Sequence, residues 1–384
     1  MLILHTADWH VGKRLGRFDR MDETERVLDH LVEVTREARV DLVVVAGDLF
    51  DRALTAYANL GLVLETLHRL ADTGARVVAI PGNHDSAELF DVLSPYLESV
   101  AVTLVARPRR PQDGGVVAVP ARDGRTVAQV ACLPFLHEAQ TVDFMSDVEE
   151  WHKSYAQRIR SICHRYAAWM EARRDAKTID LLVGHFMVHG AIPSGSERQL
   201  HIGEAYMARE DAIPNVSYAA LGHIHRDQPA PGTDVPAYYS GSLMQLDFGE
   251  SGQDKSVIVV EVTPDSTKSP ERVPIEGSRK LLRAQGTLEE LRAGVSGFGD
   301  AILDVGVVTD GPSAGLADEV RSFLPNALYV RALFERDEEV ASERKGLGLA
   351  DLYEEYSVTR HGESPSEEVN AAFRELCDEV AIEL

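Results

Sequence analysis

Short apolar segments alternate with longer amphipathic ones over the first 80 residues of the chain. Residues 2–6, 40–46 and 75–79 are apolar runs of strand length, and the second is rich in valine. Between them, residues 21–38 and 56–72 carry apolar side chains at helical spacing. Strand, helix, strand, helix, strand is typical of a largely parallel α/β layer. We therefore expect an α/β fold in which strand ends converge on one edge.

Composition sets the broad class. A chain of 384 residues is too long for one average domain, and 44% hydrophobic with 26% charged residues is typical of a soluble globular protein. No apolar run approaches the ~18 residues of a membrane helix, and no secretory signal is visible. The cysteines are odd in number, distant and without a Cys-x-x-Cys pattern: Cys132, Cys163 and Cys377. We expect a reducing, cytoplasmic location and no membrane partner.

The formal charge of −23 opposes nucleic-acid binding at long range. The charge is uneven, because residues 335–384 hold 15 acidic and 5 basic side chains and so carry −10 of the total. Divalent cations bound at a site would also reverse the field locally. Net charge therefore weakens a DNA hypothesis but leaves it open.

Residues that can bind metal follow the first two apolar segments. Asp8 and His10 are two apart, so they share one side of an extended chain. Asp48 ends the valine-rich segment, where ligands bind in open α/β sheets, and its two oxygens could bridge two cations. Asp-x-His alone is more often a strand end with surface polar residues. The loop that follows it carries Lys13 and Arg14, which could meet a phosphate backbone or only solvent.

The third apolar segment leads into Ile-Pro-Gly-Asn-His-Asp at residues 80–85. Pro-Gly breaks the strand and turns the chain, which delivers Asn83 and His84 to the strand's carboxyl edge. An asparagine oxygen binds hard cations, and a histidine beside it can hold, give or take a proton. The hexamer alone is an ordinary polar turn, so its weight depends on the other strand ends.

Two later apolar segments end in histidines. Residues 179–183 are followed by Gly-His, which places His185 at a strand end. Residues 216–221 are followed by Gly-His-Ile-His, in which His223 and His225 share a face. The strand-end set contains nitrogen and oxygen ligands but no thiolate: Asp8, His10, Asp48, Asn83, His185, His223 and His225. This chemistry suits two Mn²⁺, Fe²⁺ or Zn²⁺ ions ~3.5–4 Å apart, which can polarise a phosphoryl group. The sequence therefore predicts a phosphoesterase.

The rest of the chain suggests further parts. Residues 147–175 have the spacing of one long helix, and 264–274 are polar, Pro-bearing and unpatterned, as in an interdomain linker. A first domain would then span 1–263. Residues 275–334 read as a small α/β unit, and 335–384 as an acidic tail with helical apolar spacing. The tail is either a docking element for a partner or a packed end.

Five motifs in this order resemble the calcineurin-like metallophosphoesterase superfamily: Asp-x-His, Gly-Asp-x-x-Asp-Arg, Gly-Asn-His-Asp, Gly-His and Gly-His-x-His, over residues 8–225. Within it, residues 6–10, 47–51, 239–242 and 248–250 are similar to the SbcD nuclease subunits and their archaeal and eukaryotic counterpart, the meiotic-recombination-eleven nuclease. The resemblance implies a four-layer αββα sandwich with a small α/β cap domain at 275–334 and a C-terminal helical tail.

The resemblance also implies roles for individual residues. One ion would be held by Asp8, His10, Asp48 and His225, and the other by Asp48, Asn83, His185 and His223. His84 would protonate the leaving oxygen or steady the phosphate. Asp51 matches the residue that orients this histidine in phosphatases, and Arg52 resembles a phosphate-contacting arginine, although a surface salt bridge is its plain alternative.

The implied activity is that of a Mn²⁺-dependent DNA nuclease. Family likeness indicates exonuclease action on double strands and endonuclease action on single strands and hairpins, in DNA repair, recombination and replication. It also implies an SbcC-type ATPase partner, a homodimer and a nucleoid-associated place in the cytoplasm. The rivals are another dinuclear-metal phosphoesterase, such as a phosphatase or cyclic-nucleotide phosphodiesterase, and a catalytically inactive scaffold of the same fold.

Overall fold

The computed structural model describes residues 1–137, 154–203, 206–334, 352–354, 356–358 and 363–379. The chain divides into two compact units. The first comprises Met1–Ala284, Gly294–Val305 and Leu324–Tyr329, and the second comprises Gln285–Ala293, Gly306–Phe323 and Val330–Leu384. None of the described helices is both long enough and apolar enough to cross a membrane.

A six-stranded sheet forms one half of the first unit. Its order is β14-β13-β1-β2-β3-β4, in which β1 to β4 are parallel and β13 runs antiparallel to β1. The strands are β1 (Leu2–Thr6), β2 (Leu42–Ala46), β3 (Arg76–Ile80), β4 (Val102–Leu104), β13 (Ser256–Glu261) and β14 (Glu271–Pro274).

A second six-stranded sheet has the order β11-β12-β10-β7-β6-β5. Its central strands β6, β7, β10 and β12 are parallel, and β5 and β11 close the edges antiparallel. The strands are β5 (Val116–Pro120), β6 (Val127–Leu133), β7 (Thr178–His185), β10 (Tyr218–Gly222), β11 (Gln228–Pro229) and β12 (Ala237–Tyr239). A separate short pair joins β8 (Met187–Val188) to β9 (Met207–Ala208).

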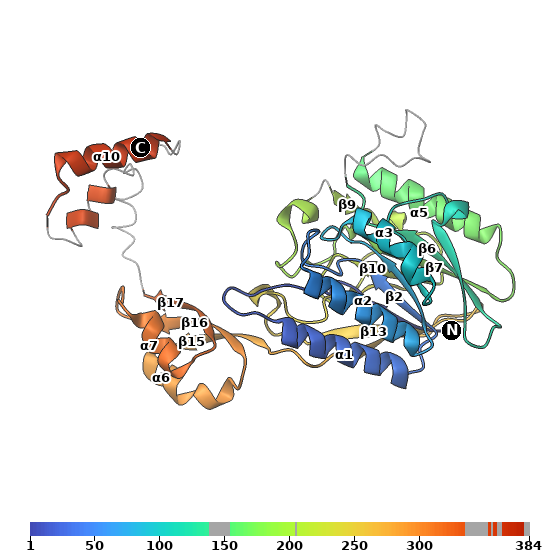
Figure 1. Ribbon diagram of the computed structural model, residues 1–384, viewed down its shortest axis with the longest axis horizontal. Helices are drawn as coiled ribbons and strands as arrows, with labels where there is room; N and C mark the ends of the chain where they lie inside the picture. The colour runs from blue at the N-terminus through green and yellow to red at the C-terminus, as the bar shows by residue number, and fades with distance from the viewer. Residues whose placement is uncertain (138–153, 204–205, 335–351, 355, 359–362, 380–384) are drawn as a thin grey trace. The chain divides into compact units, whose positions relative to one another are not determined.

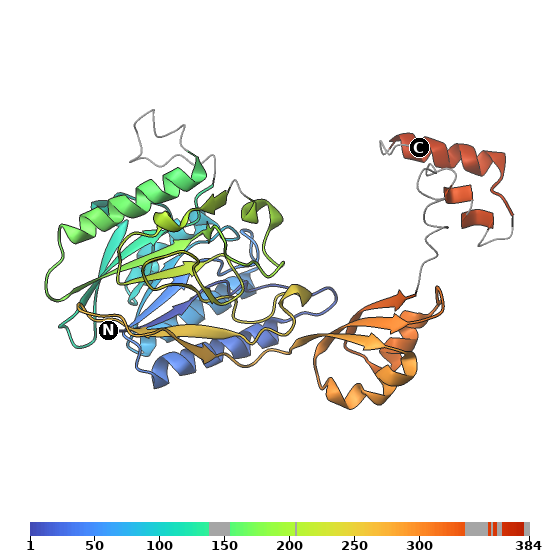
Figure 2. The same cartoon turned by 180° about the vertical axis from the view of Figure 1, so that it is seen from behind.

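The two sheets face each other and carry helices on their outer sides, as Figure 1 shows and Figure 2 repeats from behind. Three apolar clusters fill the three interfaces of this four-layer sandwich. One lies between the first sheet and its helices, one between the second sheet and its helix, and one between the sheets. The helices are α1 (Met21–Glu37), α2 (Tyr57–Asp72), α3 (Ala87–Glu98) and α5 (Tyr155–Glu171). The expected αββα fold is confirmed.

Strand β2 illustrates how the sequence specifies the layers. Val43 and Val45 pack against the helices, whereas Leu42, Val44 and Ala46 pack against the second sheet. Successive side chains of a strand point to opposite faces, so a strand buried on both faces must be apolar throughout. This is why residues 40–46 are so rich in valine.

Two sequence expectations need correction. Residues 264–274 were expected to be an unpatterned linker, but Glu271–Pro274 form β14, which pairs antiparallel with β13. The strand is polar because it is a largely exposed edge, so it lacks the apolar signature of a central strand. The helix expected over 147–175 begins at Tyr155, after a capping box between Ser154 and Gln157, and ends at Glu171. Residues 147–153 lie outside the described residues.

The segment after residue 280 contains a small three-stranded sheet of order β15-β16-β17. Its elements are β15 (Leu281–Gly286), α6 (Leu288–Ala293), β16 (Ile302–Val308), α7 (Leu316–Phe323) and β17 (Ala327–Leu333). The strand-like segments expected at 302–308 and 328–333 are thus present. Of the expected helical tail, the structure describes chiefly α10 (Glu367–Glu379), and Phe373 of this helix stacks on Tyr353 with ring centroids 4.2 Å apart.

Candidate metal centre

The seven strand-end ligands are supplied by both sheets of the first unit. In the first sheet, Asp8 and His10 follow β1, Asp48 follows β2 and Asn83 follows β3. In the second sheet, His185 ends β7, and His223 and His225 follow β10. Strand β2 contacts both β7 and β10, so the carboxyl edges of the two sheets adjoin. All seven side chains are buried.

The first group of ligands is compact. Asp8, His10, Asp48 and His225 each offer a ligand atom, and these atoms lie within 4.8 Å of one another. The Nε2 atom of His10 is 3.2 Å from Nε2 of His225 and 3.6 Å from Oδ2 of Asp48. This is the set that the resemblance implies for one ion.

The second group surrounds the Oδ1 atom of Asn83. That oxygen is 3.0 Å from Nε2 of His185 and 2.9 Å from Nδ1 of His223. Nε2 of His185 is also 3.5 Å from Oδ2 of Asp48. Asp48 therefore faces both groups, as a bridging carboxylate must.

Three of the ligand histidines use one ring nitrogen for a hydrogen bond outside the ligand groups. This hydrogen bond orients the ring so that its second nitrogen faces the other ligands. Nδ1 of His185 lies 2.7 Å from the carbonyl oxygen of Ala46, and Nε2 of His223 lies 3.1 Å from that of His201. Because a carbonyl only accepts, these nitrogens carry the proton and leave the opposite nitrogen as a ligand. Nδ1 of His225 similarly faces the Ser196 hydroxyl at 2.6 Å. Such outer hydrogen bonds are the usual support of metal-binding histidines.

The backbone is strained where ligands leave their strands. Asp8, His10, Asp48 and His223 have φ values of 53°, 47°, 54° and 94°. L-residues rarely adopt this left-handed region, which costs of order 1–3 kcal/mol per residue. Four of the six described non-glycine residues with positive φ are thus candidate ligands. Strain concentrated in this way is typical of functional sites.

Glycines that precede ligand residues leave room for atoms of neighbouring strand ends. A Cβ atom on Gly82 would lie 2.2 Å from Oδ1 of Asp48, and one on Gly222 would lie 2.0 Å from the carbonyl oxygen of Ala46. A Cβ atom on Gly47 would lie 2.2 Å from Nδ1 of His185. The Gly-ligand dipeptides of the sequence therefore reflect the close approach of the two sheets.

Burial and neighbouring charges shift the pKa values of the ligand residues around Asp48. Burial raises the pKa of Asp8 to about 6. Burial also acts to raise the pKa of Asp48, but the neighbouring His185 and His84 outweigh it and hold the value well below the usual range. Burial lowers the pKa of His185, but Asp48 beside it outweighs this effect and raises the value to about 9. Asp48 is thus the stable anion between the two groups.

His84 lies beside the first group, and its ring meets that of His10 edge-on with centroids 4.6 Å apart. Its Nδ1 atom donates to the carbonyl oxygen of Asp51 at 2.8 Å. Asp51 is the residue expected to orient His84, and it makes this contact through its main-chain oxygen. The carboxylate lies 3.8 Å from Nδ1 of His10 and 3.3 Å from Nζ of Lys13.

The cations expected to meet DNA all lie near carboxylates. Lys13 and Arg52 face Asp51, at 3.3 and 3.7 Å, and Arg14 faces Asp19 at 3.3 Å. The side chain of Arg52 is 83% exposed, and its phosphate contact stays a prediction.

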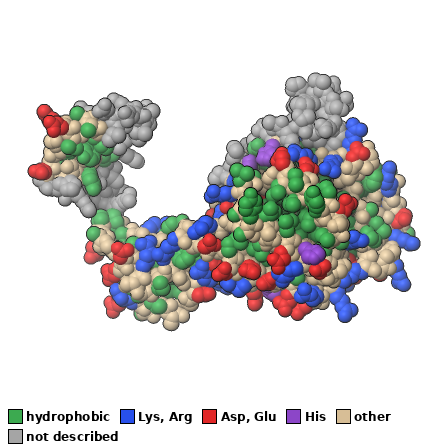
Figure 3. Space-filling model, in the orientation of Figure 1, with side chains coloured by type: hydrophobic (Ala, Val, Ile, Leu, Met, Phe, Trp, Pro, Cys, Tyr) green, Lys and Arg blue, Asp and Glu red, His purple; other side chains and the backbone are tan. Residues whose placement is uncertain are grey.

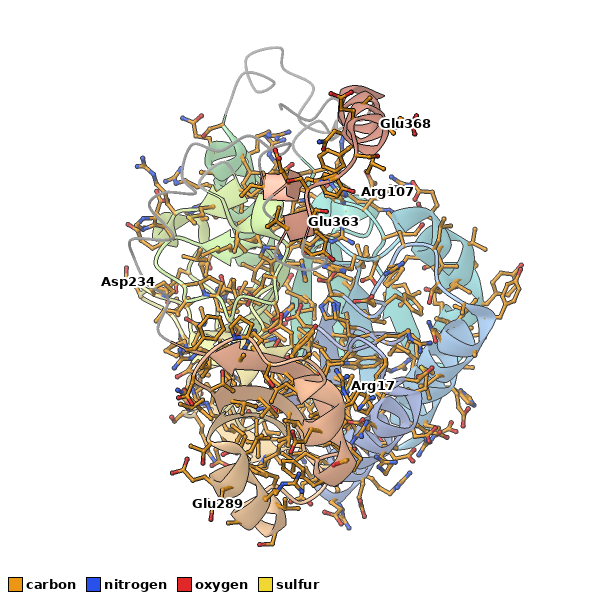
Figure 4. The ribbon with its side chains drawn as sticks, turned by 90° about the vertical axis from the view of Figure 1, so that its left-hand side faces the viewer. Arg17, Arg107, Asp234, Glu289, Glu363 and Glu368 are labelled. Atoms are coloured by element: carbon orange, nitrogen blue, oxygen red, sulfur yellow. The ribbon has the colours of Figure 1, made fainter. Side chains whose placement is uncertain are left out.

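The basic cluster at residues 107–110 is partly neutralised by helix α3. Arg107, labelled in Figure 4, donates to Glu88 and Asp91 at 2.6 and 2.8 Å. Arg109 donates to Asp91 at 3.2 Å. Two of the three arginines in this cluster therefore have acidic partners on α3.

Sequence reasoning missed the residues that hold the ligand loops. The Asp85 carboxylate accepts from the backbone amides of Leu49, Phe50 and Gly82, which joins the loops after β2 and β3. Nδ1 of His201 faces the side-chain amide nitrogen of Asn83 at 3.0 Å. Asp85 follows the Asn-His pair directly, which was an available signal, but His201 has no ligand spacing.

Two glutamates far along the chain support His225. Glu250 accepts a hydrogen bond from the Ser196 hydroxyl and forms an ion pair with Lys255. Glu197 accepts a hydrogen bond from the backbone amide of His225 at 3.0 Å. Both glutamates are buried. Glu250 belongs to the Phe-Gly-Glu segment that carried part of the resemblance, but its position beside a ligand becomes visible only in the fold.

Comparison with known proteins agrees with the geometry. Residues 1–227 match the calcineurin-like phosphoesterase family. The SbcD subunit of the SbcCD nuclease from Bacillus subtilis is 30% identical over 393 residues, which cover 99% of this chain and 98% of that protein. The SbcD subunit from Escherichia coli K12 is 28% identical over 366 residues, covering 92% of this chain and 90% of that one.

The order of the motifs, the four-layer sandwich and the ligand groups at adjoining strand edges agree with these matches, which extend over nearly the whole chain. The chain belongs to the calcineurin-like phosphoesterase family and, within it, to the SbcD group of nuclease subunits.

Proposed function

We propose that this protein is a DNA nuclease subunit with a dinuclear divalent-metal centre, acting with an ATPase partner of the SbcC type in DNA repair and recombination. The observation that carries the proposal is the convergence of seven nitrogen and oxygen ligands from both sheets around Asp48. The relatives are named as parts of the SbcCD nuclease, which supports DNA as the substrate.

The residues present fit a pair of cations. Nitrogens of His10 and His225 face each other at 3.2 Å, and the Nδ1 atom of His10 is buried without a hydrogen-bond partner among the described residues. A cation-binding set explains this arrangement better than a hydrogen-bond network does. Ligands without thiolate suit Mn²⁺, which is the proposed metal. When bound, two such ions polarise the phosphodiester, activate water and neutralise charge in the transition state.

The protein's own groups orient the reaction. Asp8, His10, Asp48 and His225 would hold one ion, and Asp48, Asn83, His185 and His223 the other. His84 would give a proton from Nε2 to the departing sugar oxygen, because its Nδ1 proton is committed to the Asp51 carbonyl. Burial lowers the pKa of His84, so the imidazolium that would give this proton is a stronger acid but is carried by a smaller fraction of the protein at neutral pH.

A homodimer is part of the proposal. Helices α2 and α3, with the loop before α2, expose four large apolar side chains: Leu54, Tyr57, Val92 and Tyr96 are 95%, 92%, 64% and 74% exposed. Figure 3 shows apolar side chains gathered on one face of the first unit. A contiguous apolar surface of this kind favours association, and a second copy could present the same face about a two-fold axis.

Light scattering after size exclusion tests the dimer. Replacement of Tyr57 and Tyr96 by Glu places charges in the apolar face, so we expect the double variant to run as a monomer. A control with Glu at the exposed Val308, outside this face, keeps the mass of the wild type. A monomeric wild type contradicts the proposal.

A substrate panel tests the activity. The purified protein, with and without its ATPase partner, is incubated with Mn²⁺ and end-labelled linear or hairpin DNA, a cyclic nucleotide or p-nitrophenyl phosphate. We expect cleavage of DNA and bound metal close to two ions per chain by elemental analysis. Turnover restricted to the small substrates would identify another phosphoesterase of the family, and an inert, metal-free protein would identify a scaffold.

A further inference from the structure

Arg198 lies beside the candidate metal centre. Its guanidinium donates to the carbonyl oxygen of Asn83 at 3.3 Å, directly beside the ligand side chain of that residue. The residue is exposed, so the remaining guanidinium donors are open to solvent. We propose, on the basis of the nuclease function above, that Arg198 binds a nonbridging oxygen of the phosphate that is cleaved.

The segment that carries Arg198 is fixed to the ligand His225. Glu197 accepts from the backbone amides of Ser194, Gly195 and His225, at 2.9, 2.8 and 3.0 Å. The neighbouring Ser196 hydroxyl accepts from Nδ1 of His225 and donates to Glu250. Consecutive residues 196, 197 and 198 therefore contact loops of both ligand groups. This anchoring holds the Arg198 backbone in place beside the centre, as a preorganised substrate contact requires.

Arg198 differs from the other cations near the centre in its partners. Lys13 and Arg52 face Asp51, and Lys255 pairs with the buried Glu250. Within the described part of the chain, no carboxylate forms an ion pair with Arg198, and its one hydrogen bond goes to a neutral carbonyl. A guanidinium that no acid neutralises attracts the anionic phosphate that enters beside it.

The positive charge of Arg198 lowers the pKa of three nearby histidines. Burial lowers the pKa of His201 to about 4, and the positive charge of Arg198 is the next largest cause of this shift. The same charge adds to the effect of burial on the pKa of His84 and of His137. The carbonyl oxygen of Asn83 that Arg198 contacts directly precedes the proposed proton donor His84, so Arg198 lies near His84. Its planar fork of donors matches the spacing of phosphate oxygens, which a lysine ammonium does not.

Kinetics on two substrates test the role. We expect Arg198→Ala to lower kcat/KM about 100-fold for linear DNA and for bis-p-nitrophenyl phosphate, because one charged contact to the transition state is lost. Arg198→Lys should recover part of this loss, and guanidinium ion added to the Ala variant should restore activity partially. Bound Mn²⁺ and the unfolding midpoint should match the wild type. The matched control is Arg36→Ala, an exposed arginine in the last turn of α1.

DNA binding supplies a readout that needs no turnover. Fluorescence anisotropy in EDTA should show that Arg198→Ala lowers the slope of log affinity against log salt by about 1, as loss of one phosphate contact does. Wild-type kinetics on the small diester together with a wild-type salt slope would overturn the inference. So would loss of bound Mn²⁺ in Arg198→Ala, because the residue would then only position Asn83. A wild type that cleaves the diester but no DNA refutes the nuclease proposal and leaves the diester test of Arg198 valid.

Discussion

Backbone strain at single residues is balanced by the hydrogen bonds that surround the ligand loops. The amide of His223, which has a φ of 94°, donates to the Asp8 carboxylate at 3.1 Å. The amide of His84 donates to Oδ1 of Asp48 at 2.8 Å. Each carboxylate thus accepts from the backbone of a loop that follows another strand, Asp8 with both oxygens and Asp48 with Oδ1. Asp8 and Asp48 are thus both candidate ligands and hydrogen-bond acceptors that hold the ligand loops. A substitution at either aspartate would affect both metal binding and loop geometry.

His84→Gln separates chemistry from binding. Glutamine can donate a hydrogen bond to the Asp51 carbonyl but cannot transfer a proton near neutral pH. We expect DNA cleavage to fall by at least about 100-fold, the lower range for loss of a general acid. Bound Mn²⁺ and DNA affinity should stay at wild-type values by elemental analysis and anisotropy. Full cleavage by this variant would remove His84 from the mechanism.

Gly222→Ala tests the close approach of the sheets. The new methyl group would lie 2.0 Å from the backbone oxygen of Ala46, which cannot move without shifting β2. We expect a loss of about 1–3 kcal/mol in unfolding free energy, together with reduced metal content. Gly297→Ala is the control, since its methyl group meets nothing within 4 Å. Equal thermal melts and metal contents for the two variants would contradict the argument.

At the scale of elements, the start of helix α1 is joined to the chain after β14 by a buried ion-pair network. Arg20, whose side chain is fully buried, pairs with Glu23 at 2.9 Å. Arg279 pairs with the other oxygen of Glu23 at 2.7 Å. Arg20 also donates to the carbonyl of Gln245. These contacts fix α1 against the segments that precede and follow β13.

This network predicts a pH dependence of stability. Burial acts to raise the pKa of Glu23, but Arg20 and Arg279 outweigh it and lower the value below 4.5. The folded protein therefore binds this proton less readily than the unfolded chain. The stabilisation is complete above about pH 5 and is lost as pH falls through the folded pKa.

Glu23→Gln should show the effect in urea melts. At pH 7 we expect a loss of about 3 kcal/mol, because Arg20 stays buried without its charge partner. The difference from the wild type should shrink toward pH 3. Glu33→Gln, at an exposed position of the same helix, should change stability little at either pH. A constant difference across this range would assign the loss to packing instead.

The elements also show what sequence can predict. Strand-end ligands such as Asp8 and His10 were predictable because the ends of parallel strands meet at one edge of a sheet. The expected strand periodicity does not extend to them, since both have positive φ values after the end of β1. Strand β14 was missed because an exposed edge needs no apolar residues. Asp51 was named as the residue that orients His84, but its use of the main-chain oxygen could not be predicted because main-chain atoms have no sequence signature. Glu197 and Glu250 act on His225 through tertiary contacts that no local spacing encodes.

At the scale of the whole molecule, the candidate ions would tie the two sheets together. Ligands of each proposed ion come from both sheets, so cations bind the folded protein and not the separated halves. Such binding adds about 2.7 kcal/mol of stability when free metal is 100 times the dissociation constant.

Removal of metal should therefore lower the unfolding temperature. For a domain of this size, EDTA should reduce Tm by about 5–10 °C relative to protein saturated with Mn²⁺. Asp48→Asn should abolish most of this difference, because it weakens the residue that faces both ligand groups. Melts that coincide with and without Mn²⁺ would show that the sheets are not joined by metal.

The ligands are spread from Asp8 to His225, and the last two follow β10. A nascent chain still on the ribosome, or one cut short by a premature stop before residue 223, lacks a ligand for each proposed ion. Such fragments would be inert toward the chromosome on which the cell depends. The cutting activity would therefore arise only after synthesis has passed His225, when both sheets have supplied their ligands.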